Sequence, residues 1–304
     1  MKHYSVMLNE VIDNLNIHDD GIYIDATLGY AGHSSEILKR MKRGFLFAFD
    51  NDLEAILYSR KRLSEISNNF EIFHSNFSNM KEKLDGKLVD GIIFDLGFSS
   101  PQIDNPDRGF SFMNDGPLDM RMDTTKDFSA YNVINDYSLE DLTETFFSYG
   151  EEKTSRTIAK NIVEARKKSS IKTTNELVEI IKSAVGLKYF NLQHPERKIF
   201  QAIRIEVNNE LGVLRSVLPD AINMLKPGGR ICVITFHSLE NRIVKNIFKE
   251  YSSVPLVFSG LPDIPEEYKP KIKLVNKKPI TASEEELKEN SRSKSAKLRV
   301  IERV

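Results

Sequence analysis

Two glycines near the start of the chain could let a ligand approach the backbone. Gly29 and Gly32 belong to the segment Asp25-Ala26-Thr27-Leu28-Gly29-Tyr30-Ala31-Gly32-His33, which joins a predicted strand to a predicted helix. Glycine permits close approach, and a helix N-terminus attracts anionic groups. The spacing is G-x-x-G, whereas dinucleotide enzymes carry G-x-G-x-x-G beside their pyrophosphate. The loop therefore favours a cofactor without phosphates, such as S-adenosylmethionine.

Acidic residues end several of the apolar runs. Asp25, Asp50 and Asp95 each close a predicted strand, and ligands of open α/β sheets bind at that end of the strands. Asp50 lies 21 residues after Gly29, close to the spacing of about 20 expected for an acid that accepts from ribose hydroxyls. Asp25 could bind the cofactor amine or support the loop. Together with the turn at 225–230, typical of methyltransferases before their fifth strand, these residues favour a methyltransferase over a nicotinamide oxidoreductase.

The segment Asp95-Leu96-Gly97-Phe98-Ser99-Ser100-Pro101-Gln102 could receive the methyl acceptor. Enzymes that methylate amines place a short polar segment with proline here. An exocyclic amine of cytosine or adenine is a poor nucleophile, and acceptors that hydrogen-bond its protons favour attack. We expect Asp95 and Ser99 to position this amine. Phe77, just after the third strand, could pack against adenine or could be a core aromatic residue.

Alternating strands and helices must position these residues. Apolar runs at 21–25, 45–50, 70–74, 89–95 and 230–236 predict buried strands, and 34–42 and 52–67 have helical spacing. This alternation predicts a mostly parallel sheet with helices on both faces, the Rossmann-like α/β class. Runs at 271–275 and 297–303 predict two further strands, with an antiparallel C-terminal strand.

The alternation stops after Ser100, where a loop rich in Pro, Asp, Gly and Met is followed by helical segments. Helices are expected near 139–148, 153–168 and 174–185, with Thr174 as an N-cap and Gly186 as the end of the last, and then one long helix at 197–225. We interpret 111–195 as an all-helical domain inserted into a methyltransferase domain made of 1–110 and 196–304.

Composition bounds the class of protein. The 304 residues carry a net charge of −1, but 268–304 alone has eight Lys and three Arg against five Glu, and 150–172 has seven Lys/Arg against three Glu. Such basic segments could contact phosphates, although solvated helix faces explain most charge runs. No secretory signal or membrane span is evident, and one cysteine, Cys232, excludes an intramolecular disulfide. We expect a cytoplasmic protein.

Several segments resemble the RsmH (MraW) family of rRNA methyltransferases. The resemblance runs from His3 to the C-terminus and is most specific in 95–102 and in the segment Arg108-Gly109-Phe110-Ser111-Phe112-Met113-Asn114-Asp115-Gly116-Pro117-Leu118-Asp119-Met120-Arg121-Met122. Further matches lie at 200–211, 236–240 and 295–299.

The resemblance implies methylation of the exocyclic N4 amine of one decoding-centre cytidine in 16S rRNA (position 1402 in the usual rRNA numbering), within the small ribosomal subunit. It implies that the inserted helical domain recognises RNA and that S-adenosylmethionine is the cofactor. A homodimer is possible as well. Implied cofactor contacts are Ala31, Gly32, His33, Asp50, Phe77, Asp95 and Gln102. The family usually has glycine at Ala31, and backbone contacts there should survive if φ is negative.

Other interpretations stay open for several residues. His33 could contact the cofactor or cap the backbone, and His237 could be a base or a structural anchor. Phe98, Phe110 and Phe112 could stack on RNA bases or be buried. Five acids between 104 and 123 invite a Mg²⁺ site, but methyl transfer needs no metal and arginines can pair with them, so we expect none. The alternative function is a non-catalytic rRNA-binding assembly factor that keeps the fold.

Overall fold

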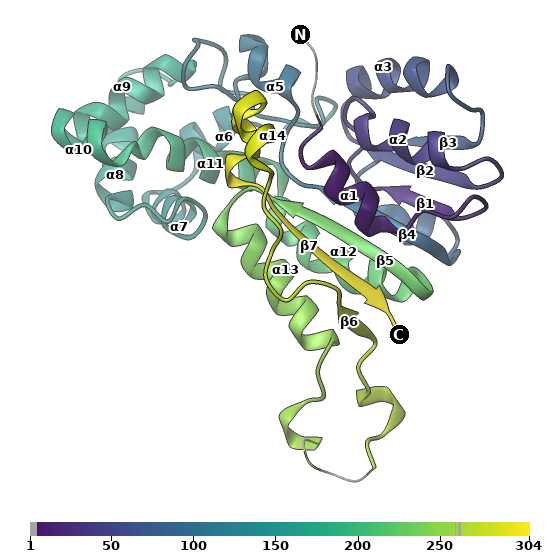
Figure 1. Cartoon of the computed structure of the whole chain (residues 1–304). Helices are drawn as coiled ribbons and strands as arrows, with labels where there is room; N and C mark the ends of the chain where they lie inside the picture. The colour runs from purple at the N-terminus through teal and green to yellow at the C-terminus, as the bar shows by residue number, and fades with distance from the viewer. Residues whose placement is uncertain (1–4, 259, 261–262) are drawn as a thin grey trace. The chain divides into compact units, whose positions relative to one another are not determined.

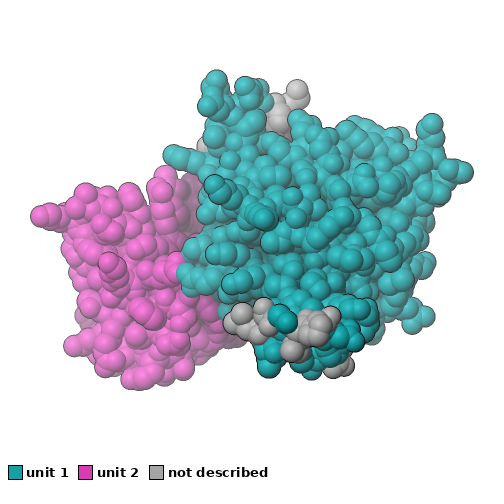
Figure 2. All heavy atoms as spheres, turned by 60° about the horizontal axis from the view of Figure 1, so that its bottom comes forward, with its two compact units in different colours: residues 1–97, 211–304 teal, residues 98–210 magenta. Residues whose placement is uncertain are grey.

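The computed structural model describes residues 5–258, 260 and 263–304, so His3 and Tyr4, where the family resemblance begins, lie outside the described residues. The chain divides into two compact units (Figure 2). Unit 1 comprises 1–97 and 211–304, and unit 2 comprises 98–210. The segment predicted as an inserted helical domain, 111–195, lies within unit 2. No helix in the described part of the chain is long and apolar enough to cross a membrane.

Unit 1 is built on a sheet whose order is β3-β2-β1-β4-β5-β7-β6 (Figure 1). The first five strands run parallel, whereas β7 runs antiparallel to both β5 and β6. This confirms the predicted Rossmann-like class. The strands are β1 (Ile22–Asp25), β2 (Phe45–Asp50), β3 (Phe70–His74), β4 (Val89–Asp95), β5 (Leu225–Thr235), β6 (Ile272–Leu274) and β7 (Lys297–Arg303).

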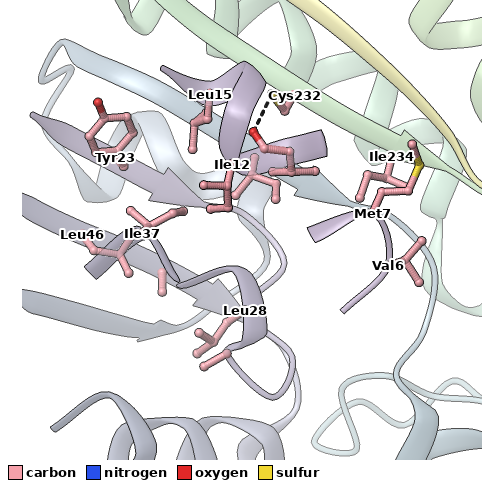
Figure 3. Close-up of a cluster of buried hydrophobic side chains, with 14 of the residues drawn as sticks. Val6, Met7, Ile12, Leu15, Tyr23, Leu28, Ile37, Leu46, Cys232 and Ile234 are labelled. Carbon is pink, nitrogen blue, oxygen red and sulfur yellow. Dashed lines mark hydrogen bonds between the residues drawn. The ribbon is translucent and has the colours of Figure 1, made fainter. Parts of the chain in front are cut away.

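Helices flank the strands of unit 1, and most of them bury apolar residues that recur at helical spacing. They are α1 (Leu8–Leu15), α2 (Gly32–Arg40), α3 (Leu53–Ser64), α4 (Met80–Lys83), α12 (Glu210–Met224), α13 (Ser238–Tyr251) and α14 (Glu284–Glu289). Side chains of α1, α2 and α3 share one buried cluster with alternate residues of β5 and β7. Figure 3 shows part of this cluster, including side chains of α1, α2 and β5. Cys232 lies in this cluster as a buried free thiol, with its Sγ 3.9 Å from the carbonyl of Val11.

Unit 2 is helical and has its own core. It contains α5 (Ser100–Asp104), α6 (Ala130–Asp136), α7 (Leu139–Gly150), α8 (Ser155–Arg166), α9 (Thr174–Val185), α10 (Leu187–Gln193) and α11 (Pro195–Asn208). Apolar residues of α6, α7, α8, α9 and α11 form a buried cluster together with Phe110, Leu118 and Met120 of the preceding loop. Phe110, Leu118 and Met120 thus anchor the loop on this core, whereas Met113 of the same loop is exposed.

Three predicted boundaries are wrong. The strand expected at 230–236 begins at Leu225, so the predicted turn at 225–230 lies within β5. The helix expected at 197–225 is broken at Asn209, whose φ of 49° is left-handed, so α11 and α12 are separate. Asparagine tolerates this conformation better than most residues. Thr173, not Thr174, caps α9, because its Oγ1 accepts from the N–H of Glu176 while the Glu176 carboxylate accepts from the N–H of Thr173. The predicted stop at Gly186 is confirmed.

Candidate active site

The parallel strands of unit 1 bring three acidic residues to one edge of the sheet. Asp25 ends β1, Asp50 ends β2 and Asp95 ends β4. Register places Asp25 beside Ala48 on β2, two residues before Asp50, and beside Ile93 on β4, two residues before Asp95. Acids that lie 25 and 45 residues apart in the sequence therefore meet at the carboxyl ends of adjacent strands. This is the ligand-binding edge of open α/β sheets.

The glycine loop is tied to this edge by the carboxylate of Asp50. Its Oδ2 accepts from the N–H of Gly29 at 2.7 Å, and its Oδ1 accepts from the N–H of Asp52 at 2.8 Å. Burial raises the pKa of Asp50 to about 6. Each oxygen of a carboxylate can accept more than one hydrogen bond. Asp50 therefore supports the loop and keeps acceptor capacity for a ligand.

Asp25 supports the glycine loop through hydrogen bonds to its carboxylate. Its Oδ2 accepts from the Ser34 hydroxyl at 2.6 Å, and its Oδ1 accepts from the N–H of Thr27 at 3.1 Å. The side chain is buried, and burial raises its pKa to about 6. Asp25 could either bind the cofactor amine or support the loop, and these contacts are those of a residue that supports the loop.

Ala31 adopts a left-handed conformation, with φ of 58°. The negative φ on which the expected backbone contacts of Ala31 depended is therefore not observed. Glycine, which the family usually has here, adopts a left-handed conformation without strain. The N–H of Ala31 donates to the carbonyl of Leu28 at 2.8 Å, and its carbonyl accepts from the N–H and the hydroxyl of Ser35. Both backbone groups of Ala31 thus stabilise the turn into α2.

Gly32 opens α2 where the N-terminal segment crosses it. A Cβ at Gly32 would lie 1.6 Å from Oγ of Ser5, so no larger residue fits beside that side chain. His33 is buried, with its Nε2 3.1 Å from the carbonyl of Val6 and its Nδ1 3.7 Å from Oδ2 of Asp95. His33 thus connects the N-terminal segment to the acid that ends β4.

Asp95 is held by its backbone more than by its side chain. Its N–H donates to the hydroxyl of Thr27 at 2.7 Å. Its Oδ1 is buried and has no hydrogen-bond partner among the described residues. Burial, and the nearby carboxylates of Asp25, Glu240 and Glu286, raise the pKa of Asp95 well above its usual value. A buried acceptor without a partner is costly, so this oxygen is suited to receive a donor from a ligand.

Phe77 lies in the short helix η1 (Phe77–Asn79) and contacts Phe94 of β4 edge to face, with ring centroids 5.6 Å apart. The ring is only partly buried. Phe77 therefore packs on the strand that carries Asp95 and keeps part of its ring exposed.

Ser99 and Gln102 belong to unit 2, whereas the other predicted site residues belong to unit 1. Ser99 precedes α5, and its N–H donates to Oε1 of Gln102 at 2.9 Å. The Ser99 hydroxyl is buried without a hydrogen-bond partner within the described residues. Gln102 thus fixes the backbone that presents the Ser99 hydroxyl.

Four side chains of unit 2 form a continuous stack next to this segment. The rings of Phe98 and Phe110 lie nearly parallel, with centroids 5.7 Å apart. Arg204 covers Phe98 at 4.5 Å, and Arg108 lies over Phe110 at 5.9 Å. Guanidinium groups bind aromatic faces in this way. The rings of Phe98 and Phe110 therefore both contact side chains of unit 2.

The most specific segment of the chain, 108–122, is held by a residue that sequence reasoning missed. Asn208 donates from Nδ2 to the carbonyl of Met120 at 2.8 Å and accepts at Oδ1 from the N–H of Met122 at 2.8 Å. Asp119 pairs with Arg121 at 2.6 Å, which confirms that an arginine partners one of these acids. Asn208 gave no signal because its partners are backbone atoms 86 and 88 residues away.

His237 lies at the start of α13, with its Nε2 3.1 Å from Oε1 of Glu240. The other carboxylate oxygen of Glu240 accepts from the N–H groups of Phe236 and His237, at 2.8 and 3.3 Å. The Glu240 carboxylate therefore anchors the turn from β5 into α13. Both ring nitrogens of His237 are buried without a hydrogen bond to any described residue, so both interpretations of His237 stay predictions.

The whole length of this chain matches one family of known proteins. The model of the MraW methylase family matches residues 1–304. Proteins named ribosomal RNA small subunit methyltransferase H are 50% identical, one from Clostridioides difficile (99% of this chain and 99% of its own length) and one from Exiguobacterium sibiricum (100% and 98%). A candidate methyltransferase from Streptococcus mutans, solved in complex with SAH, has 12% identity and a TM-score of 0.47, and the match covers 99% of each chain.

Proposed function

This chain belongs to the MraW methylase family, and on that premise we propose that it transfers a methyl group from S-adenosylmethionine to the exocyclic N4 amine of one decoding-centre cytidine in 16S rRNA. The substrate is the small ribosomal subunit in the cytoplasm. The relatives at 50% identity, named as small-subunit rRNA methyltransferases, support the RNA class. One structural observation carries the chemistry: a buried carboxylate oxygen of Asp95 without a partner among described residues, at the strand end that adjoins the glycine loop.

The residues of unit 1 fit S-adenosylmethionine by charge. The cofactor supplies an electrophilic methyl group on a sulfonium centre and also carries an ammonium and a carboxylate. The acids at the ends of β2 and β4 match the positive groups, and the N-terminus of α2 at Gly32 and His33 matches the carboxylate. Asp50 would accept from ribose hydroxyls and Phe77 would contact the adenine. Ala31 would shape the turn. Gln102, which belongs to unit 2, is a cofactor contact only by the family resemblance.

The acceptor amine requires positioning rather than a strong base. Its lone pair is conjugated with the cytosine ring, so hydrogen bonds from its protons to fixed acceptors favour attack in line with the leaving sulfur. We assign this positioning to Asp95 and Ser99, whose buried oxygens have no partner within the described part of the chain. After attack the amine is acidic enough to release its proton to water or to a carboxylate. The helical segment 111–195 would recognise the RNA around the target.

One experiment tests this function against a non-catalytic role in ribosome assembly. The protein is incubated with methyl-labelled S-adenosylmethionine and small subunits from a strain that lacks the modification, and the label is mapped. We expect label on one cytidine N4. Asp95→Asn should lower kcat strongly, whereas Lys245→Gln, an exposed change on α13, should not. Tight binding to the subunit without transfer would instead support the assembly factor, and nicotinamide dinucleotide binding would support an oxidoreductase.

A further inference from the structure

One face of α8 carries cations that form no salt bridge with any described residue. Arg156 and Lys160 lie one turn apart on this helix, and Lys153 precedes it. All three side chains are exposed, whereas Ile158, Ala159 and Ile162 are buried in the core of unit 2. The cations therefore lie on the solvent side of an amphipathic helix. We call Lys153, Arg156 and Lys160 the α8 stripe.

The α8 stripe forms no salt bridge among the described residues, whereas three other lysines of unit 2 do. Glu164 is an acid within range of the stripe, since its pKa is lowered mainly by Lys167 and also by the charge of Lys160. Lys167 pairs with Glu164 at 2.7 Å, Lys182 pairs with Glu179 at 3.0 Å and Lys198 pairs with Glu152 at 3.0 Å. Arg166 donates to the carbonyls of Ile134 and Tyr137. Within 5–258, 260 and 263–304, none of the three stripe cations forms an ion pair.

The neighbouring helix has the opposite charge. Glu140, Asp141 and Glu144 are exposed on α7, and Asp141 and Glu144 line a cavity of about 440 Å³ together with Glu206. Acids lining this cavity would repel a polyanion, whereas the α8 stripe would attract one. Unit 2 is therefore polarised between two helices that pack against each other (Figure 1).

We propose that the α8 stripe binds phosphates of the rRNA backbone, so that unit 2 meets RNA through α8 and not through the acidic surface of α7. This inference rests on the proposed function for its ligand. Contacts of this kind are independent of base sequence, and each one released on mutation lowers the salt dependence of binding. The stripe would thus set the affinity and orientation of the RNA, while the choice of cytidine lies elsewhere.

The test compares two matched double variants in RNA binding. Arg156→Gln/Lys160→Gln removes two stripe charges, and Lys245→Gln/Lys249→Gln removes two exposed charges with the same spacing on α13 of unit 1. Affinity for a 16S rRNA fragment is measured between 50 and 200 mM salt. We expect the slope of log affinity against log salt to become shallower by about 1.5 to 2 in the stripe variant only.

A third variant removes a neighbouring carboxylate instead of a cation. Glu164→Gln frees Lys167 from its ion pair and removes the negative charge that acts on Lys160, so it should make the slope steeper by about 1. All four residues of the double variants are exposed, so the midpoint of thermal unfolding should stay close to that of the parent for each. An unchanged slope in the stripe variant, or an equal change in the α13 variant, would overturn the inference.

The outcome is separable from that of the proposed function. If the parent protein binds rRNA with a steep salt dependence that the stripe variant loses, the inference holds even when no methyl group is transferred. If the parent methylates the RNA and the stripe variant keeps the same slope, the function holds and the inference fails.

Discussion

The guanidinium of Arg204 lies 4.5 Å from the ring centroid of Phe98 while it forms two hydrogen bonds, of 2.8 and 3.0 Å, with the carboxylate of Glu210. Phe98 directly precedes Ser99, the residue to which we assign positioning of the acceptor amine. The ion pair and the stack therefore fix one end of the segment 99–102. Arg204 acts on the reaction only through this segment, which makes it a positioning residue.

Replacing Arg204 by lysine tests this relationship. Lysine keeps the charge but loses the planar fork and the stacking, so we expect unit 2 to lose about 2 kcal/mol of stability. We also expect a lower kcat with a smaller change in the Kd for the cofactor, because the other proposed cofactor contacts lie in unit 1. Arg197→Lys is the matched control, because Arg197 lies 5.9 Å from the Phe112 ring and is exposed. Equal effects of the two substitutions in urea unfolding and in kcat would contradict the assignment.

Substitutions at Ala31 report on its left-handed backbone. Ala31→Gly relieves strain of about 1 to 2 kcal/mol, but it loses a buried methyl group and gains chain entropy in the unfolded state. These terms nearly cancel, so stability should change by less than about 1 kcal/mol. Ala31→Val adds a β-branched side chain at φ of 58° in a buried site and should cost more than about 2 kcal/mol. Thermal unfolding of both variants checks this, and a harmless valine would refute it.

Burial of Asp25 should make the protein less stable as pH rises. Its pKa is about 6 in the folded chain and near 3.8 when exposed, so the folded state binds more protons between these values. Stability attributable to this group is therefore present below pH 4 and is lost as pH rises to 6, by about 3 kcal/mol.

Asp25→Asn should remove this loss. Relative to the parent, the variant should gain stability between pH 4 and pH 7, as measured by urea unfolding at both values. Ser34→Ala is a useful comparison, because it removes the 2.6 Å hydrogen bond to the ionised form and should extend the loss to higher pH. A parent and an Asn variant with parallel pH profiles would show that Asp25 is not desolvated.

Cofactor affinity should depend on pH through Asp50. Its pKa of about 6 means that the carboxyl group is increasingly neutral below that pH, and a cationic ligand then loses attraction. Binding of S-adenosylmethionine should weaken on the order of tenfold from pH 7 to pH 5. S-adenosylhomocysteine, which lacks the sulfonium charge, should weaken less, and Asp50→Asn should flatten both profiles. Calorimetric titration measures each, and equal profiles for the two ligands would contradict the role of charge.

The sequence by itself determined the sheet and the positions of its acids. Strands β1 to β4 and β7 begin and end within one residue of the predicted ranges, because continuous apolar runs bounded by turns leave few alternatives. Asp25, Asp50 and Asp95 end their strands as expected. Because β1 lies between β2 and β4 in the sheet, these three ends are neighbours. The family segments likewise fixed the class of protein.

Only the tertiary structure decided how those residues are used. The left-handed φ of Ala31, the break at Asn209 and the backbone contacts of Asn208 depend on partners and packing that no local spacing encodes. His33 and Val6 are 27 residues apart, and Arg204 and Phe98 are 106 apart, so sequence patterns carry no signal for either contact. Local periodicity specifies elements, because hydrophobic faces repeat within a helix or strand. Side-chain partners form only when the fold closes, and that is where the site acquired its geometry.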